Sequence, residues 1–168
     1  ILHTRGLSLD AGMPEIDDTV EGVANLDSPE TRISAVLACL FEEKGELHLV
    51  LTRRASHLRH HRHEVSLPGG RCEQGESPLE TALREAHEEI GIDKHLVTEV
   101  DLFVDDHGPW KYETVIAIAD PQLVAHEQND ESLQVEWIAF ADVAKKNLHP
   151  SFANTWPQLL AILQMRFV

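Results

Sequence analysis

Residues 67–92, LPGGRCEQGESPLETALREAHEEIGI, carry the clearest local structural signals in the chain. Ser77 can cap a helix that has Pro78 at its first position, and Glu80 completes a capping box. Gly91 supplies a left-handed stop at the other end. The sequence therefore predicts a helix over 78–90, entered through a glycine-containing loop.

This predicted helix has one apolar face and one acidic face. The apolar positions recur at helical spacing and predict a stripe that packs on the core: Leu79, Ala82, Leu83, Ala86 and Ile90. Glu85, Glu88 and Glu89 lie three and four residues apart, so their carboxylates project together and repel one another. We expect a positive group among them, and oxygen ligands favour a hard cation such as Mg²⁺ or Mn²⁺ over zinc. The alternative is a solvated acidic face in a Glu-rich protein.

On either side of this stretch the sequence predicts strands. Two hairpins are indicated, one from 33–41 with 47–51 and one from 100–104 with 110–118. The first run, 33–41, is almost continuously apolar, which is typical of a central strand buried on both faces. A short strand at 133–137, a turn around Val143 and a final helix with Thr155 as its N-cap follow. We expect an acidic arm or loop over 1–30 and one mixed α/β domain over 31–168.

Length and charge exclude several classes of protein. The chain has 168 residues and a formal net charge of −15, which repels nucleic-acid backbones and anionic membrane surfaces. No apolar run approaches the ~20 residues that a bilayer span requires. Only two cysteines occur, Cys39 and Cys72, and no secretion signal is recognisable. We therefore expect a cytoplasmic protein with no nucleic-acid or membrane partner.

The spacing of residues 70–92 resembles the box of the Nudix hydrolases. In that box, Gly, any five residues and Glu are followed by any seven residues, Arg-Glu and an aliphatic position. Then come any one residue, Glu-Glu, any one residue, Gly and a second aliphatic position. The matching residues here are Gly70, Glu76, Arg84, Glu85, Ala86, Glu88, Glu89, Gly91 and Ile92. Ala86, which is smaller than the usual residue, is the mildest of departures.

The resemblance implies a Nudix fold, an α/β/α sandwich around a mixed sheet, and cleavage of a diphosphate by attack of water on phosphorus. It implies that Glu85 and Glu89 are the principal ligands of Mg²⁺ or Mn²⁺. Glu88 and the Gly69 carbonyl would be further ligands, and Arg84 and Glu76 would pair to orient the helix. A general base can come from the box or from a later loop, where Glu131 is the preferred candidate and a solvated loop carboxylate is the alternative. Nudix relatives often dimerise, so a homodimer is an open expectation.

The segment before the box resembles the additional motif of coenzyme A pyrophosphatases. Thr52, Arg54, Ala55 and Arg59 fall in register with that motif, as do Val65, Ser66 and Pro68-Gly69-Gly70. His63 stands where the motif has Gly, and Glu64 where Gln is usual. A Gly-to-His change can block a backbone position that needs positive φ.

The same segment forms a basic island in an acidic chain, with five Arg and four His between Arg53 and Arg71. Arg side chains bind phosphate bidentately, which makes four of them candidate substrate-binding residues: Arg53, Arg54, Arg59 and Arg62. The alternative is ion pairing with the protein's own carboxylates. His57, His60, His61 and His63 match no common zinc site and are better explained as loop residues. Trp110 and Tyr112 could stack on a base or pack in the sheet.

The leading expectation is a metal-dependent diphosphatase whose small-molecule substrate is coenzyme A or one of its thioesters. The first alternative is a Nudix enzyme that acts on nucleoside derivatives such as ADP-ribose, a dinucleoside polyphosphate or a dNTP. The second is a non-catalytic Nudix module that binds a nucleotide to regulate a partner. Such modules tend to lose box carboxylates, whereas Glu76, Glu85, Glu88 and Glu89 are all present here.

Overall fold

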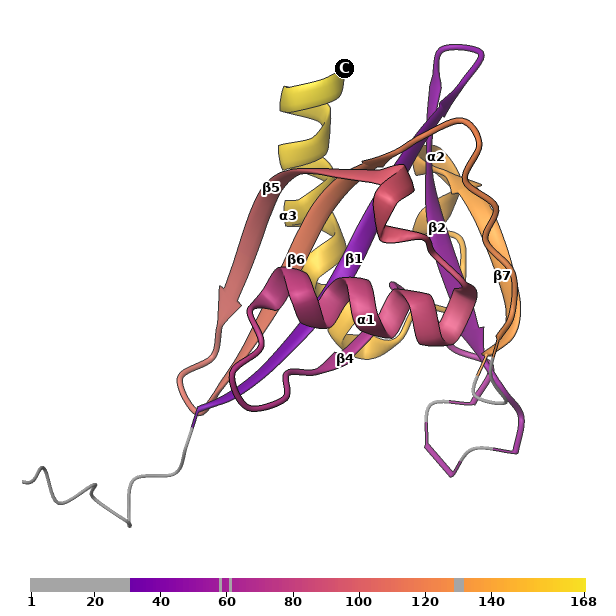
Figure 1. Cartoon of the computed structure of the whole chain (residues 1–168). Helices are drawn as coiled ribbons and strands as arrows, with labels where there is room; N and C mark the ends of the chain where they lie inside the picture. Colours follow the sequence, from indigo (N-terminus) through magenta and orange to yellow (C-terminus); the bar gives the residue numbers. More distant parts are fainter. Residues whose placement is uncertain (1–30, 58, 61, 129–131) are drawn as a thin grey trace, which may run out of the picture.

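The computed structural model describes residues 31–57, 59–60, 62–128 and 132–168. The predicted acidic arm, residues 1–30, therefore lies outside the described residues. Figure 1 shows the elements in chain order. They are β1 (Arg32–Glu43), β2 (Glu46–Arg54), β3 (Val65–Ser66), β4 (Gly69–Arg71), α1 (Pro78–Ile90), the 3₁₀-helix η1 (Lys94–Leu96), β5 (Val97–Asp106), β6 (Trp110–Ala119), β7 (Ser132–Ala139), α2 (Phe140–Val143) and α3 (Pro150–Phe167).

The strands in the described part of the chain form one mixed sheet. Its order is β3-β2-β1-β6-β5, with β4 added beside β1 and β7 beside β2. β1 and β6 run parallel, whereas β1 is antiparallel to both β2 and β4. The two predicted hairpins are confirmed as β1–β2 and β5–β6, with register pairs such as Leu40 with Leu49 and Phe103 with Thr114.

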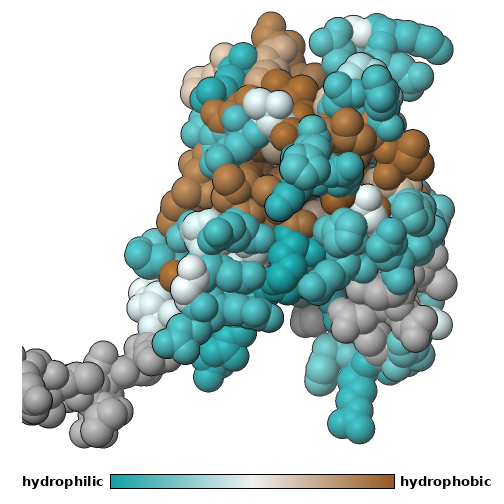
Figure 2. Space-filling view, in the orientation of Figure 1, coloured by the Kyte–Doolittle hydropathy of each residue, from teal (hydrophilic) through white to brown (hydrophobic). Residues whose placement is uncertain are grey.

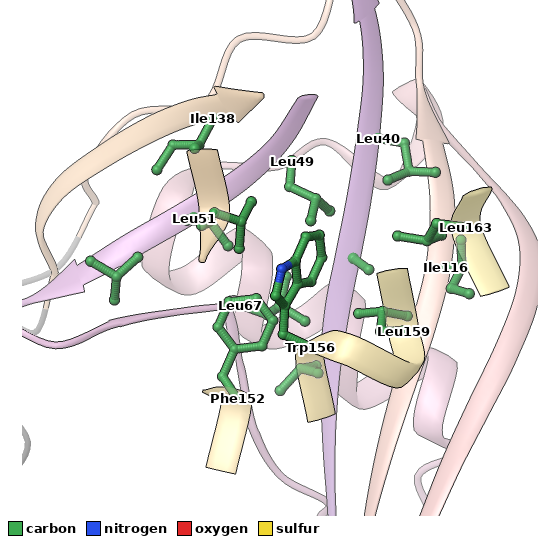
Figure 3. Packing of buried hydrophobic residues seen from close by; sticks show 14 residues of the cluster. Leu40, Leu49, Leu51, Leu67, Ile116, Ile138, Phe152, Trp156, Leu159 and Leu163 are labelled. Carbon is green, nitrogen blue, oxygen red and sulfur yellow. The ribbon is translucent and has the colours of Figure 1, made fainter. Parts of the chain in front are cut away.

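Helices cover both faces of this sheet, with α1 in front of it and α3 behind it in Figure 1. Residues 35–40 of β1 are buried and alternate between two core clusters, one on each face. The cluster on the α3 face packs Phe152 and Trp156 against strand residues such as Leu49 and Leu51 (Figure 3). The central strand buried on both faces and the α/β/α arrangement are therefore confirmed.

The final helix begins earlier than the sequence predicted. Thr155 is not its N-cap but a buried residue inside α3, where its hydroxyl donates to the carbonyl of Ser151 at 3.0 Å. The helix begins at Pro150, whose ring presets φ for a first helical position. The His149 side chain caps it by accepting from the Ser151 N–H at 3.2 Å. No helix among the described residues is long and apolar enough to cross a bilayer.

Candidate active site

Helix α1 begins and ends where its local signals predict. The Ser77 hydroxyl accepts from the Glu80 N–H at 3.2 Å, and the Glu80 carboxylate accepts from the Ser77 N–H at 2.7 Å. Gly91 adopts the left-handed conformation with φ of 68°. Ala82, Ala86 and Ile90 are buried against the sheet, which leaves the acidic face of the helix turned away from the core.

Two glycines let the loop before α1 lie close to the helix. A Cβ atom at Gly70 would lie 2.5 Å from the carboxylate of Glu85. A Cβ atom at Gly69 would lie 2.3 Å from the carbonyl oxygen of Ala35 on β1. At Gly69 the neighbour is backbone, so there is no room for a side chain, and at Gly70 a side chain would have to displace the carboxylate of Glu85. Glycine at these positions therefore allows the loop to fit between β1 and the Glu85 side chain.

The predicted pair of Arg84 and Glu76 is a bidentate ion pair. Arg84 Nε donates to Glu76 Oε1 at 2.7 Å, and Arg84 Nη2 donates to Glu76 Oε2 at 3.0 Å. Glu76 also accepts from the Thr81 hydroxyl at 2.8 Å and the Glu73 N–H at 3.0 Å. The hydrogen bonds from Arg84, with those from Glu73 and Thr81, lower the pKa of Glu76 to about 2. These contacts tie the loop before α1 to the middle of the helix.

Arg84 also supplies the positive group among the box carboxylates. Its Nη1 lies 2.9 Å from Glu85 Oε1 and 3.5 Å from Glu88 Oε2, so two of the three carboxylates meet at one nitrogen. In the described part of the chain, no three His, Cys, Asp or Glu side chains stand close enough together to hold a metal ion. The donor set nevertheless fits a hard cation, because Glu85, Glu88 and Glu89 offer only oxygen ligands and share one helix face.

The preferred candidate base, Glu131, precedes β7 in the sequence and lies outside the described residues. Glu127, one of the acids on the same loop, uses its carboxylate to accept from the Val135 N–H at 3.0 Å. That bond fixes the loop to β7 and gives Glu127 a structural role.

The basic island forms the loop between β2 and β3. The Arg54 N–H donates to the Glu64 carbonyl at 3.0 Å, and the His63 N–H donates to the Arg54 carbonyl at 3.0 Å, which closes the loop. His63 has φ of 62°, so it adopts the left-handed conformation that a glycine would favour. The motif glycine suggested that this position needs positive φ. His63 adopts positive φ in place of that glycine.

The four candidate substrate-binding arginines differ in their surroundings. Arg53 Nη2 lies 3.9 Å from Glu136, which Lys146 also contacts, so Arg53 belongs to an ion-pair network. Arg54 Nε is buried and has no hydrogen-bond partner among the described residues. Arg59 and Arg62 are exposed on the loop. Arg54 is thus the one of the four with a buried donor that has no partner in the described part of the chain.

The predicted aromatic pair divides between two roles. Trp110 is 39% exposed and stacks on His107, with ring centroids 4.0 Å apart and an interplanar angle of 17°. Tyr112 packs against the core cluster on the α3 face, and its burial raises the pKa of its phenol. No local pattern in the sequence indicated that His107, a residue of the preceding turn, would stack on Trp110.

A largely apolar groove lies beside α1. It has a volume of about 570 Å³ and includes Leu79, Leu83 and His87 among its lining residues. Figure 2 shows an apolar surface above the hydrophilic band in this view. Leu102 and Val104 of β5 are among the exposed apolar residues. Arg84 also lines the groove. The groove therefore borders the candidate site at Arg84.

Three comparisons agree with this geometry. A family model of the NUDIX domain matches residues 31–159. The Nudix hydrolase RenU of M. smegmatis has a solved structure that superposes with a TM-score of 0.74 and 30% identity, covering 80% of this chain and 87% of that one.

Two curated relatives match over shorter stretches. One is a nucleoside triphosphate pyrophosphatase/Nudix hydrolase fusion protein of Bifidobacterium longum, 37% identical over 99 residues that cover 58% of this chain and 20% of the relative. The other is a putative 8-oxo-dGTP diphosphatase 3 of Mycobacterium tuberculosis, 39% identical over 100 residues that cover 55% of this chain and 45% of the relative. The match thus spans less than half of either relative. Because the family model covers most of its length, this chain belongs to the Nudix family.

Proposed function

We propose that this chain is a hydrolase of phosphoric anhydrides that cleaves the diphosphate of coenzyme A or its thioesters with Mg²⁺ or Mn²⁺. We also propose that the catalytic unit is one domain over residues 31–168. The observation that carries the hydrolase assignment is the assembled box. Glu85 lies against Gly70, and the Arg84 guanidinium contacts the carboxylates of Glu76, Glu85 and Glu88.

Glu85 and Glu89 would hold the metal, with Glu88 and the Gly69 carbonyl as further ligands. When bound, a divalent ion would neutralise the diphosphate and lower the pKa of a water molecule at the reacting phosphorus. Arg84 would then remain paired with Glu76, which keeps the helix and its loop in place. Glu131 would accept the proton of the attacking water.

The choice of coenzyme A rests on the loop between β2 and β3. The conformation of His63 keeps the left-handed turn that the motif glycine would supply, so Arg54 and Arg59 can occupy the same loop positions. The buried Nε of Arg54 offers a donor to a phosphate oxygen. Arg53 and Arg62 would contribute positive charge at the rim.

The main alternative is a nucleotide substrate, which the names of the two curated relatives favour. Coenzyme A, ADP-ribose, a dinucleoside tetraphosphate and 8-oxo-dGTP should be incubated with the full chain and Mg²⁺ or Mn²⁺, and the products identified by mass spectrometry. Coenzyme A should give 4′-phosphopantetheine and adenosine 3′,5′-bisphosphate. Turnover of a nucleotide with coenzyme A untouched would overturn the substrate assignment.

The catalytic assignment itself is tested by Glu89→Gln, which keeps the size of the side chain and removes its charge. We expect kcat to fall by about 10²-fold or more, the scale seen when one charge-stabilising group leaves an active site. Glu43→Gln, at an exposed position at the end of β1, is the matched control and should retain wild-type turnover. A fully active Glu89→Gln variant would contradict the metal-ligand role, and a regulatory module would show no turnover with any substrate.

A further inference from the structure

A second cavity lies on the opposite face of the sheet from α1. It has a volume of about 330 Å³ and is formed by the β5–β6 hairpin and the first turns of α3. The Thr155 hydroxyl oxygen of α3 lies 3.3 Å from a carboxylate oxygen of Asp105 of β5, which places the cavity on the α3 face. The lining residues include Asp105, His107, Trp110, Tyr112, Ser151 and Asn154.

This cavity combines a flat aromatic surface with polar side chains. Trp110 stacks one face of its indole on His107 and is still 39% exposed, so part of its ring surface can contact a ligand. Asn154 supplies both an amide donor and an amide acceptor, and Ser151 a hydroxyl. An aromatic surface beside an amide is suited to a heteroaromatic base.

The strand register brings an arginine to the same face. Tyr112 of β6 pairs with both Asp105 of β5 and Ser34 of β1, and Ser34 pairs with Arg71 of β4. Paired residues point to the same side of a sheet, so these four side chains form a row across the α3 face. Gly70, the preceding residue, faces α1, which is consistent with Arg71 facing the other way.

A second arginine lies next to this row. Arg32, the first residue of β1, pairs with Trp110 and has the same parity as Ser34. Arg32 and Arg71 are exposed, and neither forms an ion pair with another residue of the described part. In a chain with 29 acidic residues, two guanidinium groups without carboxylate partners beside an aromatic cavity favour an anionic ligand.

The row of paired residues ends next to the box. Arg71, at the β4 end of the row, directly follows Gly70, and the carboxylate of Glu85 lies against Gly70. A ligand that extends from Trp110 along the row past Arg71 would therefore reach the strand that borders the box.

We propose that the cavity, with Arg71 and Arg32, binds a phosphorylated purine nucleoside, which in the proposed reaction is the 3′-phosphorylated adenosine end of coenzyme A. The base lies against the exposed part of Trp110, and the phosphomonoester lies at the two guanidinium groups. This assignment rests on the proposed function and adds the residues that select the nucleoside end of the substrate.

The test separates binding from hydrolysis. Adenosine 3′,5′-bisphosphate lacks the scissile diphosphate, so its affinity for the full chain can be measured by calorimetry without added metal. Arg71→Ala and Trp110→Ala should each weaken binding at least tenfold, the scale of losing one charge-assisted hydrogen bond or one aromatic stack. Lys111→Ala removes a charge from the neighbouring residue of β6, whose side chain points to the other face, and should bind as the wild type does.

Unphosphorylated adenosine should bind more weakly and with equal affinity to the wild type and Arg71→Ala. Melting curves show whether each variant is folded. If Trp110→Ala unfolds, the test rests on Arg71→Ala, because Arg71 is exposed and its replacement should leave the chain folded. Equal affinity of Arg71→Ala and Lys111→Ala for the bisphosphate would overturn the proposal even if coenzyme A were hydrolysed. Arg71-dependent binding without coenzyme A hydrolysis would instead overturn the proposed function and support this cavity.

Discussion

Replacing His63 with glycine should stabilise the folded chain. The residue adopts φ of 62°, and a left-handed conformation costs a residue with a Cβ atom about 1–2 kcal/mol. Glycine removes this cost but loses about 0.5–1 kcal/mol more backbone entropy on folding. The difference leaves a net stabilisation of about 0.5–1 kcal/mol. For a chain of this length, that corresponds to an increase in Tm of about 2 °C.

The measurement is a thermal melt of the wild type and three variants. His63→Ala removes the imidazole but keeps the Cβ atom, so its Tm should not rise. Arg62→Gly places a glycine at the adjacent position, which has no positive φ, and its Tm should fall because only the entropic cost remains. A rise in His63→Ala equal to that in His63→Gly would refute the reasoning, because the imidazole and not the backbone would then be responsible.

Three other perturbations test the site and the core. Gly70→Ala should lower turnover strongly with a smaller loss of stability, because its Cβ atom would displace the carboxylate of Glu85; assays and melts of the same sample check both. The pKa of Glu76 is about 2 in the folded chain against an ordinary value of 4.5, so its stabilising contribution is complete above pH 4.5 and is lost as the pH falls toward 2. The difference in Tm between wild type and Glu76→Gln should therefore be constant near neutral pH and shrink below pH 4.5; a constant difference down to about pH 3 would contradict the ion-pair interpretation. Burial raises the pKa of the Cys39 thiol to about 12, so a thiol reagent near pH 8 should modify the half-buried Cys72 first and Cys39 only on unfolding, as mass spectrometry would show.

Helix α1 could be predicted to the residue because every determinant is local. The capping box, the proline at the first position and the left-handed Gly91 all lie within or next to the helix, and each acts through bonds to nearby backbone. The pairing of Arg84 with Glu76 was implied by the resemblance to the Nudix box, and the ion pair is present in the structure.

The predicted start of α3 was wrong because a distant contact competes with a local sequence pattern. Thr155 has the residue type of an N-cap, but in the structure its hydroxyl reaches Asp105, which is 50 residues away in the chain. Pro150 and the side chain of His149 start the helix instead. A threonine inside a helix and a threonine at its N-terminus look alike until the packing partner is known.

The cavity on the α3 face depends on pairing that no local pattern reveals. β3 and β4 have only two and three residues, too few for an alternating pattern to be recognised. Without the pairing of β4 with β1, the face on which Arg71 lies cannot be assigned. The sequence identified Trp110 as a candidate for stacking on a base, but its neighbours in space come from β5 and α3.

The parallel pairing of β1 with β6 has a consequence for folding kinetics. Ala38 pairs with Ile116, 78 positions further along the chain, and the entire catalytic loop and helix lie between them. Closing so long a loop costs entropy before the central contacts can form, so this pairing should be a slow step in refolding. The capping signals can start α1 early, but its acidic face gains its final position over Gly70 only after β1 has its neighbours. Assembly of the catalytic residues and formation of the sheet centre should therefore occur together in time.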